Sequence, residues 1–415
     1  MSAHPPSSAD NLISNKKRLR IAVLNRTFST AGGGAERYSI ALVEQLAASH
    51  EVHVFSQEIA HQWPGVTYHQ VSRPMRKPRW INQLWFATCT WWWTRNDFDV
   101  VHSHENTWHG DVQTVHVLPV KHTLFHGIQG WQQVLRWVKV ATSPRLLAYL
   151  GLERLRFACR PHRKIVVTSE SLRSIMELTY PQSRGMISVI TPGVALPHLP
   201  VTPLRKKNAR TLLGLPLEGN CVLFVANDFR KKGLQTLLKA LARCPPGFML
   251  AIAGNLSEMT FFTEQVKTLD MESRVFFLGP LKNVEPAYES ADCLAHPTLE
   301  DTFAMVVLEA MSYGLPVIVS DSRYCGISGL LQDGENALIV ADPLNLFELQ
   351  QALEHVLTQP LLNAQLSKGA IDFAGCYQWA RLAGQQELLY LDLVKAKVGI
   401  SLDDSSDSTD LDGRK

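Results

Sequence analysis

Two acidic side chains, Asp301 and Glu309, stand eight residues apart in the second half of the 415-residue chain. Eight residues are a little over two helical turns, so both carboxylates can lie on the same side of one helix. The residues between them are apolar, and a carboxylate in an apolar helix is costly unless it has a hydrogen-bonding partner. A ligand hydroxyl could be that partner for Glu309. The alternatives are a buried ion pair for Glu309 and a helix-capping role for Asp301.

Two further segments could hold phosphate. Gly32-Gly33-Gly34 follows the apolar run 21–25, and a glycine-rich turn that opens a helix offers bare N–H groups to an anion. Its spacing is not that of a dinucleotide-binding fingerprint. Arg230-Lys231-Lys232-Gly233 follows the apolar run 222–226, and its cations could hold a diphosphate. A flexible loop and a solvated basic loop are the alternatives for these two segments.

The elements that must position these residues are short apolar runs alternating with helix-period segments. Short buried strands that alternate with helices indicate parallel sheets, and two such series in succession predict two doubly wound, Rossmann-like α/β domains. The predicted strands are 21–25, 52–55, 66–71, 100–102, 114–117, 165–168 and 187–190, then 222–226, 249–253, 275–278, 293–296, 317–320 and 338–340. Helices are expected at 35–48, 234–241, 303–313, 346–357 and 378–395.

The domain boundary is expected near residues 196–215, where several prolines should interrupt any helix. The prediction is a first domain over 18–198, a second over 199–376, and a helix over 377–398 that packs back on the first domain. Residues 1–17 and the acidic stretch 399–415 are polar and aperiodic, so both are expected to be disordered.

Composition narrows the classes of partner. Apolar residues make up 46% of the chain and the net charge is only +3, which argues against a nucleic-acid binder. Residues 61–165, however, hold fourteen Lys and Arg against five Asp and Glu, together with nine of the ten tryptophans. This region suits an acceptor side or an anionic membrane surface, although at least half of its tryptophans are expected to fill the core.

The remaining composition points to the cytosol. Seven widely spaced cysteines without a CxxC pair predict reduced thiols, and no zinc site or other metal-ligand cluster is evident. No signal peptide or transmembrane run is recognisable. We therefore expect a cytoplasmic protein, peripheral on the inner face of the plasma membrane if it binds lipid.

The Asp301-x7-Glu309 segment resembles the E-x7-E signature of retaining glycosyltransferases with the GT-B fold, family GT4. Further segments match that family in the same order: Gly32-Gly33-Gly34-Ala35-Glu36-Arg37, Thr114-Val115-His116, Thr191-Pro192-Gly193-Val194, Lys232-Gly233, Ala253-Gly254, Phe277-Leu278-Gly279 and Asp333-Gly334-Glu335-Asn336. The resemblance covers about residues 18–395 and extends, more loosely, to lipopolysaccharide-core glucosyltransferases. The chain departs from the family pattern at Asp301, where Glu is usual, at Ala304, where Gly is usual, and at Asn227, where Arg is common.

The resemblance implies a nucleotide-diphosphate sugar bound in a cleft between two domains. Lys232 and Arg230 would neutralise the diphosphate, helped by the backbone at Gly33 and Gly34 and at the start of the second-domain helix, Thr302, Phe303 and Ala304. Glu309 would accept hydrogen bonds from the ribose, Asp301 would contact the transferred sugar, and His116 would face the reacting carbon. The cations would replace a metal, so neither a metal nor another cofactor is expected.

The implied reaction is transfer of a hexose, with retention of anomeric configuration, to a glycan or lipid-linked acceptor. A UDP-sugar such as UDP-glucose is the favoured donor, and cell-envelope polysaccharide or lipopolysaccharide synthesis the expected setting. A nucleotide-sugar epimerase on the same fold and a catalytically silent scaffold are the alternatives.

Overall fold

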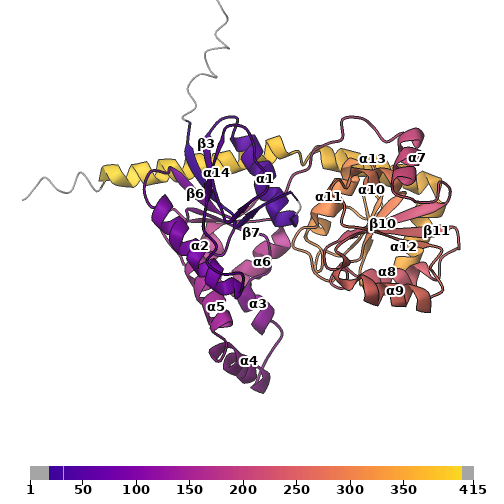
Figure 1. The fold of residues 1–415 in the computed structure, drawn as a ribbon, viewed down its shortest axis with the longest axis horizontal. Coiled ribbons are helices and arrows are strands. Elements are labelled where there is room, and N and C mark those ends of the chain that lie inside the picture. Colours follow the sequence, from indigo (N-terminus) through magenta and orange to yellow (C-terminus); the bar gives the residue numbers. More distant parts are fainter. Residues whose placement is uncertain (1–17, 31, 404–415) are drawn as a thin grey trace, which may run out of the picture.

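The structure, a computed structural model, describes residues 18–30 and 32–403 of the chain. Two α/β domains lie side by side, and the last helix runs back along the first of them (Figure 1). Both main sheets are parallel throughout, which confirms the predicted fold class. The predicted N-terminal arm over 1–17 and the part of the predicted tail beyond residue 403 lie outside the described residues.

The first domain is built on a seven-stranded sheet in the order β5-β3-β1-β6-β7-β8-β9. Its central strands are apolar runs buried on both faces, as a parallel sheet covered by helices requires. The strands are β1 (Arg20–Leu24), β3 (Glu51–Ser56), β5 (Val66–Gln70), β6 (Val100–Ser103), β7 (Val112–Val115), β8 (Lys164–Val167) and β9 (Ile187–Val189), with a separate pair, β2 (Thr27–Phe28) and β4 (Glu58–Ile59). The helices are α1 (Gly34–Leu46), α2 (Arg79–Thr94), α3 (Val120–Phe125), α4 (Trp131–Ala141), α5 (Pro144–Arg156) and α6 (Glu170–Thr179).

The second domain has a six-stranded sheet in the order β12-β11-β10-β13-β14-β15. The strands are β10 (Asn220–Ala226), β11 (Phe248–Gly254), β12 (Val275–Gly279), β13 (Cys293–His296), β14 (Val317–Ser320) and β15 (Leu338–Val340). The helices are α7 (Pro203–Leu212), α8 (Leu234–Leu241), α9 (Met259–Thr268), α10 (Glu285–Ser290), α11 (Met305–Ser312), α12 (Leu346–Thr358) and α13 (Pro360–Gly375). Helix α7 falls inside the stretch where prolines were expected to prevent any helix. That expectation is wrong because Pro203 occupies the first helical turn and Thr202 caps it.

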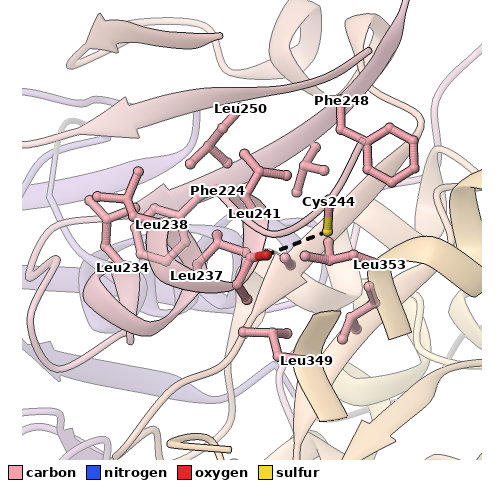
Figure 2. Packing of buried hydrophobic residues seen from close by; sticks show 14 of the residues in the cluster. Phe224, Leu234, Leu237, Leu238, Leu241, Cys244, Phe248, Leu250, Leu349 and Leu353 are labelled. Carbon is pink, nitrogen blue, oxygen red and sulfur yellow. Dashed lines mark hydrogen bonds between the residues drawn. The ribbon is translucent and has the colours of Figure 1, made fainter. Parts of the chain in front are cut away.

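One face of the second sheet is sealed by leucines of α8 and α12. Figure 2 shows Leu234, Leu237 and Leu241 packed with Leu349 and Leu353 against the strands. Complete burial of one such side chain contributes about 1.5–3 kcal/mol. Cys244 lies in the same cluster, where its Sγ donates to the Ala240 carbonyl oxygen at 3.5 Å. Burial raises the pKa of the Cys244 thiol to about 12, so this cysteine is an inert part of the core.

The last helix, α14 (Trp379–Asp403), returns to the first domain and packs against α1 and β6. Its fully buried Tyr390 shares a 2.6 Å hydrogen bond with Nδ1 of His102, and Lys397 forms a 2.8 Å ion pair with Asp111. The helix extends five residues past its predicted end at 398, because each residue added to a nucleated helix costs little. Within residues 18–30 and 32–403, no helix is both long and apolar enough to cross a membrane.

The tryptophans of the first domain do not fill its core. Seven of the nine in residues 61–165 are exposed, and the other two are half-buried, so the expectation that at least half are core residues is wrong. In α2 the buried positions are taken by smaller side chains, among them Phe86, Ala87 and Thr90. Trp85, Trp91, Trp92 and Trp93 of this helix are exposed, although the Trp93 ring centroid lies 6.2 Å from that of Phe55. Helix α4 projects beyond α3 and α5 (Figure 1) and exposes Trp131 and Trp137.

Candidate functional site

The two domains meet where the start of α1 faces the start of α11. α1 begins at Gly34, with Gly33 as its N-cap residue, and α11 begins at Met305. A Cβ atom on Gly34 would lie 3.3 Å from the Met305 sulfur, so the two helix N-termini are adjacent. Helix N-termini carry unpaired N–H groups and partial positive charge. The contact between the domains is therefore a place that favours an anion.

Lys232 lies beside this contact and is paired with Asp301. Its Nζ donates to Oδ2 of Asp301 at 2.7 Å and to the Glu300 carbonyl oxygen at 2.8 Å. The turn that holds Lys232 requires glycine at the next position, because Gly233 has a φ of 80° and a Cβ there would lie 1.9 Å from the Pro297 carbonyl oxygen. The structure thus brings together the cation and the carboxylate that the sequence indicated.

Asp301 uses both carboxylate oxygens within the protein. Oδ1 accepts from the N–H groups of Phe303 at 3.2 Å and Ala304 at 2.8 Å, while Oδ2 accepts from Lys232 and, at 3.2 Å, from Nε2 of His296. Burial alone would raise the pKa of Asp301, but His296 and Lys232 outweigh it and hold the pKa below its ordinary value. Asp301 is therefore an ionised residue that organises the loop before α11 by accepting hydrogen bonds from its backbone.

Helix α11 starts later than the sequence indicated. Neither Asp301 nor Thr302 is its N-cap; that position is held by Ala304, which has no capping side chain and a φ of 70°. An alanine in the left-handed region is strained by about 1–2 kcal/mol. The hydrogen bonds from Phe303 and Ala304 to Asp301 close a tight turn that delays the helix.

Glu309 has found partners from both domains. Its Oε1 lies 2.8 Å from Nη1 of Arg37, on α1, and its Oε2 accepts from the Tyr288 hydroxyl at 2.6 Å. Burial alone would lower the pKa of Arg37, but Glu309 outweighs burial and raises this pKa, so the Arg37 guanidinium keeps its charge. Burial, reinforced by Glu309, raises the pKa of Tyr288 well above its usual range. The ion-pair alternative for Glu309 is thus realised.

His116 belongs to a row of three neutral histidines. Its Nε2 shares a 2.9 Å hydrogen bond with Nδ1 of His104, whose ring packs 4.3 Å from that of His102. Burial, reinforced by Arg156, lowers the pKa of His116 to about 3. Burial, reinforced by His116 and Arg156, likewise lowers the pKa of His102 to about 3. At neutral pH these rings can donate and accept hydrogen bonds but carry no charge.

Thr302 joins the histidine row to the second domain. Its hydroxyl donates to the His116 carbonyl oxygen at 2.6 Å, and its own carbonyl oxygen accepts from the Ser169 hydroxyl at 2.7 Å. Thr302 therefore links the loop before α11 to the carboxyl end of the first sheet through two hydrogen bonds. Phe303, next to it, is buried in the second core and offers no side chain to a ligand.

Arg230 is not brought to Lys232 and Asp301. Its Nε is 2.7 Å from Oε1 of Glu258, and its guanidinium lies over the Phe261 ring at 4.1 Å. The side chain is 59% exposed, so it is held at the rim by these two partners.

Several residues of the site were not singled out from the sequence. Arg37 lies inside the glycine-turn motif, one turn into the helix that follows, so the spacing from Gly34 could have indicated it. His296 is the last residue of strand β13 and lies five residues before Asp301. Its place at the end of a predicted strand could have indicated a site residue. Tyr288 and Ser169 carry no local signal, because only packing brings them to the site.

Both halves of the chain match known families. Residues 32–196 match the family described as Glycosyltransferase Family 4, and residues 205–373 match Glycosyl transferases group 1. A D-inositol 3-phosphate glycosyltransferase from Corynebacterium diphtheriae is 28% identical over 242 residues, which cover 55% of each chain. The lipopolysaccharide glucosyltransferase WaaG of Escherichia coli is 24% identical over 238 residues, or 56% of this chain and 63% of WaaG. The chain thus matches little more than half the length of these relatives.

Solved structures show the same fold. The crystal structure of the glycosyltransferase WaaG superposes with a TM-score of 0.75 at 20% identity, covering 88% of this chain and 98% of that one. Anabaena HepE in complex with UDP and glucose gives a TM-score of 0.70 at 18% identity, covering 90% and 100%. With both domains matched in their expected order, the chain belongs to the family 4 glycosyltransferases and has their GT-B fold.

Proposed function

We propose that the protein is a retaining glycosyltransferase that moves a hexose from a nucleotide-diphosphate sugar to a glycan or lipid-linked acceptor. The observation that carries the proposal is the convergence of two helix N-termini and Lys232 on one place between the domains. A UDP-sugar, with UDP-glucose as the first candidate, is supported by the similarity to a structure that holds UDP and glucose. The similarity to WaaG favours lipopolysaccharide or other cell-envelope polysaccharide as the product.

The diphosphate would lie against the starts of α1 and α11, with Gly33 and Gly34 on one side. Negative charge builds on the diphosphate as it leaves. Stabilisation of such developing charge by preorganised positive groups is usually the largest contribution to the rate enhancement. Lys232 supplies that charge as a fixed ammonium, so we propose that no metal or other cofactor takes part. Because Arg230 is held by Glu258, Lys232 carries the main share.

Glu309 would accept hydrogen bonds from the ribose hydroxyls of the donor. A carboxylate has about four acceptor sites, and Arg37 and Tyr288 use two of them. Ribose binding can therefore add to the existing contacts rather than replace them. The Arg37 ion pair would meanwhile hold the carboxylate in place and couple donor binding to domain contact.

The geometry favours substitution without a covalent enzyme intermediate. Asp301 accepts four hydrogen bonds within the protein, so we assign it the role of holding Lys232 and the loop rather than attacking the sugar. The acceptor hydroxyl would attack the anomeric carbon from the face of the leaving diphosphate. The new carbon–oxygen bond forms as the bond to the diphosphate breaks, and the hydroxyl proton passes to the leaving oxygen. Neutral His116 would orient a sugar hydroxyl.

The first domain would supply the acceptor side and face an anionic membrane. Helix α4 exposes Trp131 and Trp137 together with three aliphatic side chains, and its charged residues are Arg136 and Lys139. Apolar depth beside basic charge suits a lipid surface with anionic headgroups. We therefore propose peripheral association with the inner face of the plasma membrane and a cytoplasmic location, with no nucleic-acid partner.

Transfer of radiolabel from UDP-glucose to extracted lipopolysaccharide or lipid-linked glycan, measured in EDTA, tests this function. Retention would appear by NMR as an unchanged anomeric configuration in the product. A protein that interconverts UDP-sugars without acceptor would be an epimerase, and one that binds UDP but transfers from no donor would be a silent scaffold. Full loss of transfer in EDTA, restored by Mg²⁺ or Mn²⁺, would contradict the metal-independent mechanism.

A further inference from the structure

A cavity of about 560 Å³ opens on the first domain, beside the edge strand β5, and shares no residue with the site described above. Sites for small molecules are commonly about 300–1,000 Å³ in volume. The lining comes from the start of β1, from β3 and β5, from the end of α2 and from the segment before β6: Arg20, His53, Phe55, Tyr68, His69, Gln70, Trp93, Asp97 and Phe98.

Aromatic rings form much of this lining. The His69 ring stacks on Phe55 with centroids 4.4 Å apart and planes at 10°, and on His53 at 5.2 Å and 13°. Phe98 meets both β3 rings edge-on. Trp93, at the end of α2, is 46% exposed and offers a wide indole surface to a ligand.

Polar groups at the rim can still bind a ligand. Among the described residues, no hydrogen bond or ion pair is recorded for the carboxylate of Asp97 or the amide of Gln70, and both residues are exposed. Asp97 has a φ of 72°, so its position is set by a turn rather than by regular structure. Arg20 donates to Glu51 at 3.1 Å and to the Asp97 carbonyl oxygen at 3.2 Å, which holds its guanidinium at the rim.

We propose that this cavity binds a hexopyranose unit of a neutral oligosaccharide. The C–H faces of a pyranose ring pack well on aromatic rings, while its hydroxyls need a carboxylate, an amide and a guanidinium as partners. The charges of Arg20 and Asp97 balance, and the Arg20 guanidinium is already paired with Glu51, so the cavity does not suit a phosphate or another anion. The proposal stands on the cavity alone and does not need the transfer reaction.

Saturation-transfer NMR and calorimetry on the full chain, saturated with UDP, test the proposal with maltotriose, cellotriose and mannotriose as probes. UDP occupies the nucleotide part of the donor site, and the cavity variants below distinguish sugar bound in the cavity from sugar bound on the acceptor side. We expect millimolar binding of at least one trisaccharide, weakened about tenfold by Trp93→Ala and several-fold by Asp97→Asn. Asparagine tolerates a positive φ, so the second variant changes charge without disturbing the turn.

The matched control is Trp92→Ala, which removes a neighbouring exposed tryptophan that lies outside the cavity and stacks on Arg95. It should bind the trisaccharide like the wild type. Binding of none of the three sugars, equal loss in the Trp92 control, or tighter binding of adenosine than of any sugar would overturn the proposal. Because transfer activity is not the readout, an inactive donor site would leave this result unaffected.

Discussion

Arg37 and Glu309, 272 residues apart, form a 2.8 Å ion pair that joins α1 of the first domain to α11 of the second. The same carboxylate accepts from Tyr288 of its own domain. A residue proposed to hold the ribose is thus also a contact between the domains. The Glu309 carboxylate would thus serve both donor binding and the contact with Arg37, and mutations of the two residues can separate these roles.

Glu309→Gln should lower both stability and nucleotide affinity. The change leaves the Arg37 cation unpaired, and since Arg37 is about one-third exposed (32%), we expect a loss of about 1–3 kcal/mol rather than the larger cost of a fully buried charge. Arg37→Gln combined with Glu309→Gln removes both charges and should recover most of the stability. If Glu309 binds ribose, UDP affinity stays low in the double variant. Full recovery of UDP affinity there would leave Glu309 with a structural role only.

Lys232→Ala should weaken UDP binding by about tenfold to 100-fold, because a charge-assisted hydrogen bond contributes about 1.5–3 kcal/mol. Lys231→Ala is the matched control, since Lys231 is 58% exposed and pairs with Glu300. Arg230→Ala should have a much smaller effect than Lys232→Ala, because Glu258 holds Arg230 at the rim. Calorimetric titration with UDP measures the affinity of all three variants. Equal losses of affinity in Arg230→Ala and Lys232→Ala would show that Arg230 also binds the diphosphate.

The buried histidines should make the protein less stable as the pH falls. Burial lowers the pKa of His102 and of His116 to about 3, so the folded protein leaves them neutral while the unfolded chain protonates them below about 6.5. The unfolded state then binds more protons, and stability decreases from pH 7 towards pH 3. His102→Gln should reduce the change in Tm between pH 7 and pH 5, whereas Gln at exposed His355 should not. An identical pH dependence in wild type and His102→Gln would contradict this.

Ala304→Gly should stabilise the protein by up to about 1 kcal/mol. The alanine has a φ of 70°, where glycine carries no Cβ penalty, although glycine also loses more entropy on folding. Thermal unfolding measures the effect, and Ala304→Val should lower Tm because a branched side chain suits this backbone worse. A lower Tm for Ala304→Gly would mean that the turn made by Asp301 imposes no strain.

Binding to vesicles should depend on α4 and on salt. We expect sedimentation with anionic vesicles at low ionic strength, lost at high salt, because each basic residue near the surface contributes about 1 kcal/mol that salt screens. Replacing Trp131 and Trp137 with Ser should reduce binding more than replacing Trp91 and Trp92 on α2, since α4 lies at the tip of the first domain. Equal binding to neutral vesicles would exclude the anionic surface.

Much of the architecture is readable in the sequence because it depends on local patterns. Short apolar runs such as 222–226 and 317–320 are typical of buried strands, and their alternation with helices indicates parallel sheets. The carboxylate at 309, inside an apolar helix, had to have a partner for the same local reason. The glycine turn before α1 and the basic turn before α8 likewise predict, from local sequence, helix N-termini that can face an anion.

Only the tertiary structure decided which partners these groups have. Arg37 reaches Glu309 across the domain contact, Asp301 turns inward to Lys232 and His296, and Glu258 holds Arg230 away from them. It also decided that the tryptophans of α2 and α4 face outward. A pattern of residue types fixes which face of an element is apolar, but burial and charge pairing depend on which other elements pack against that face, and those elements lie up to hundreds of residues away.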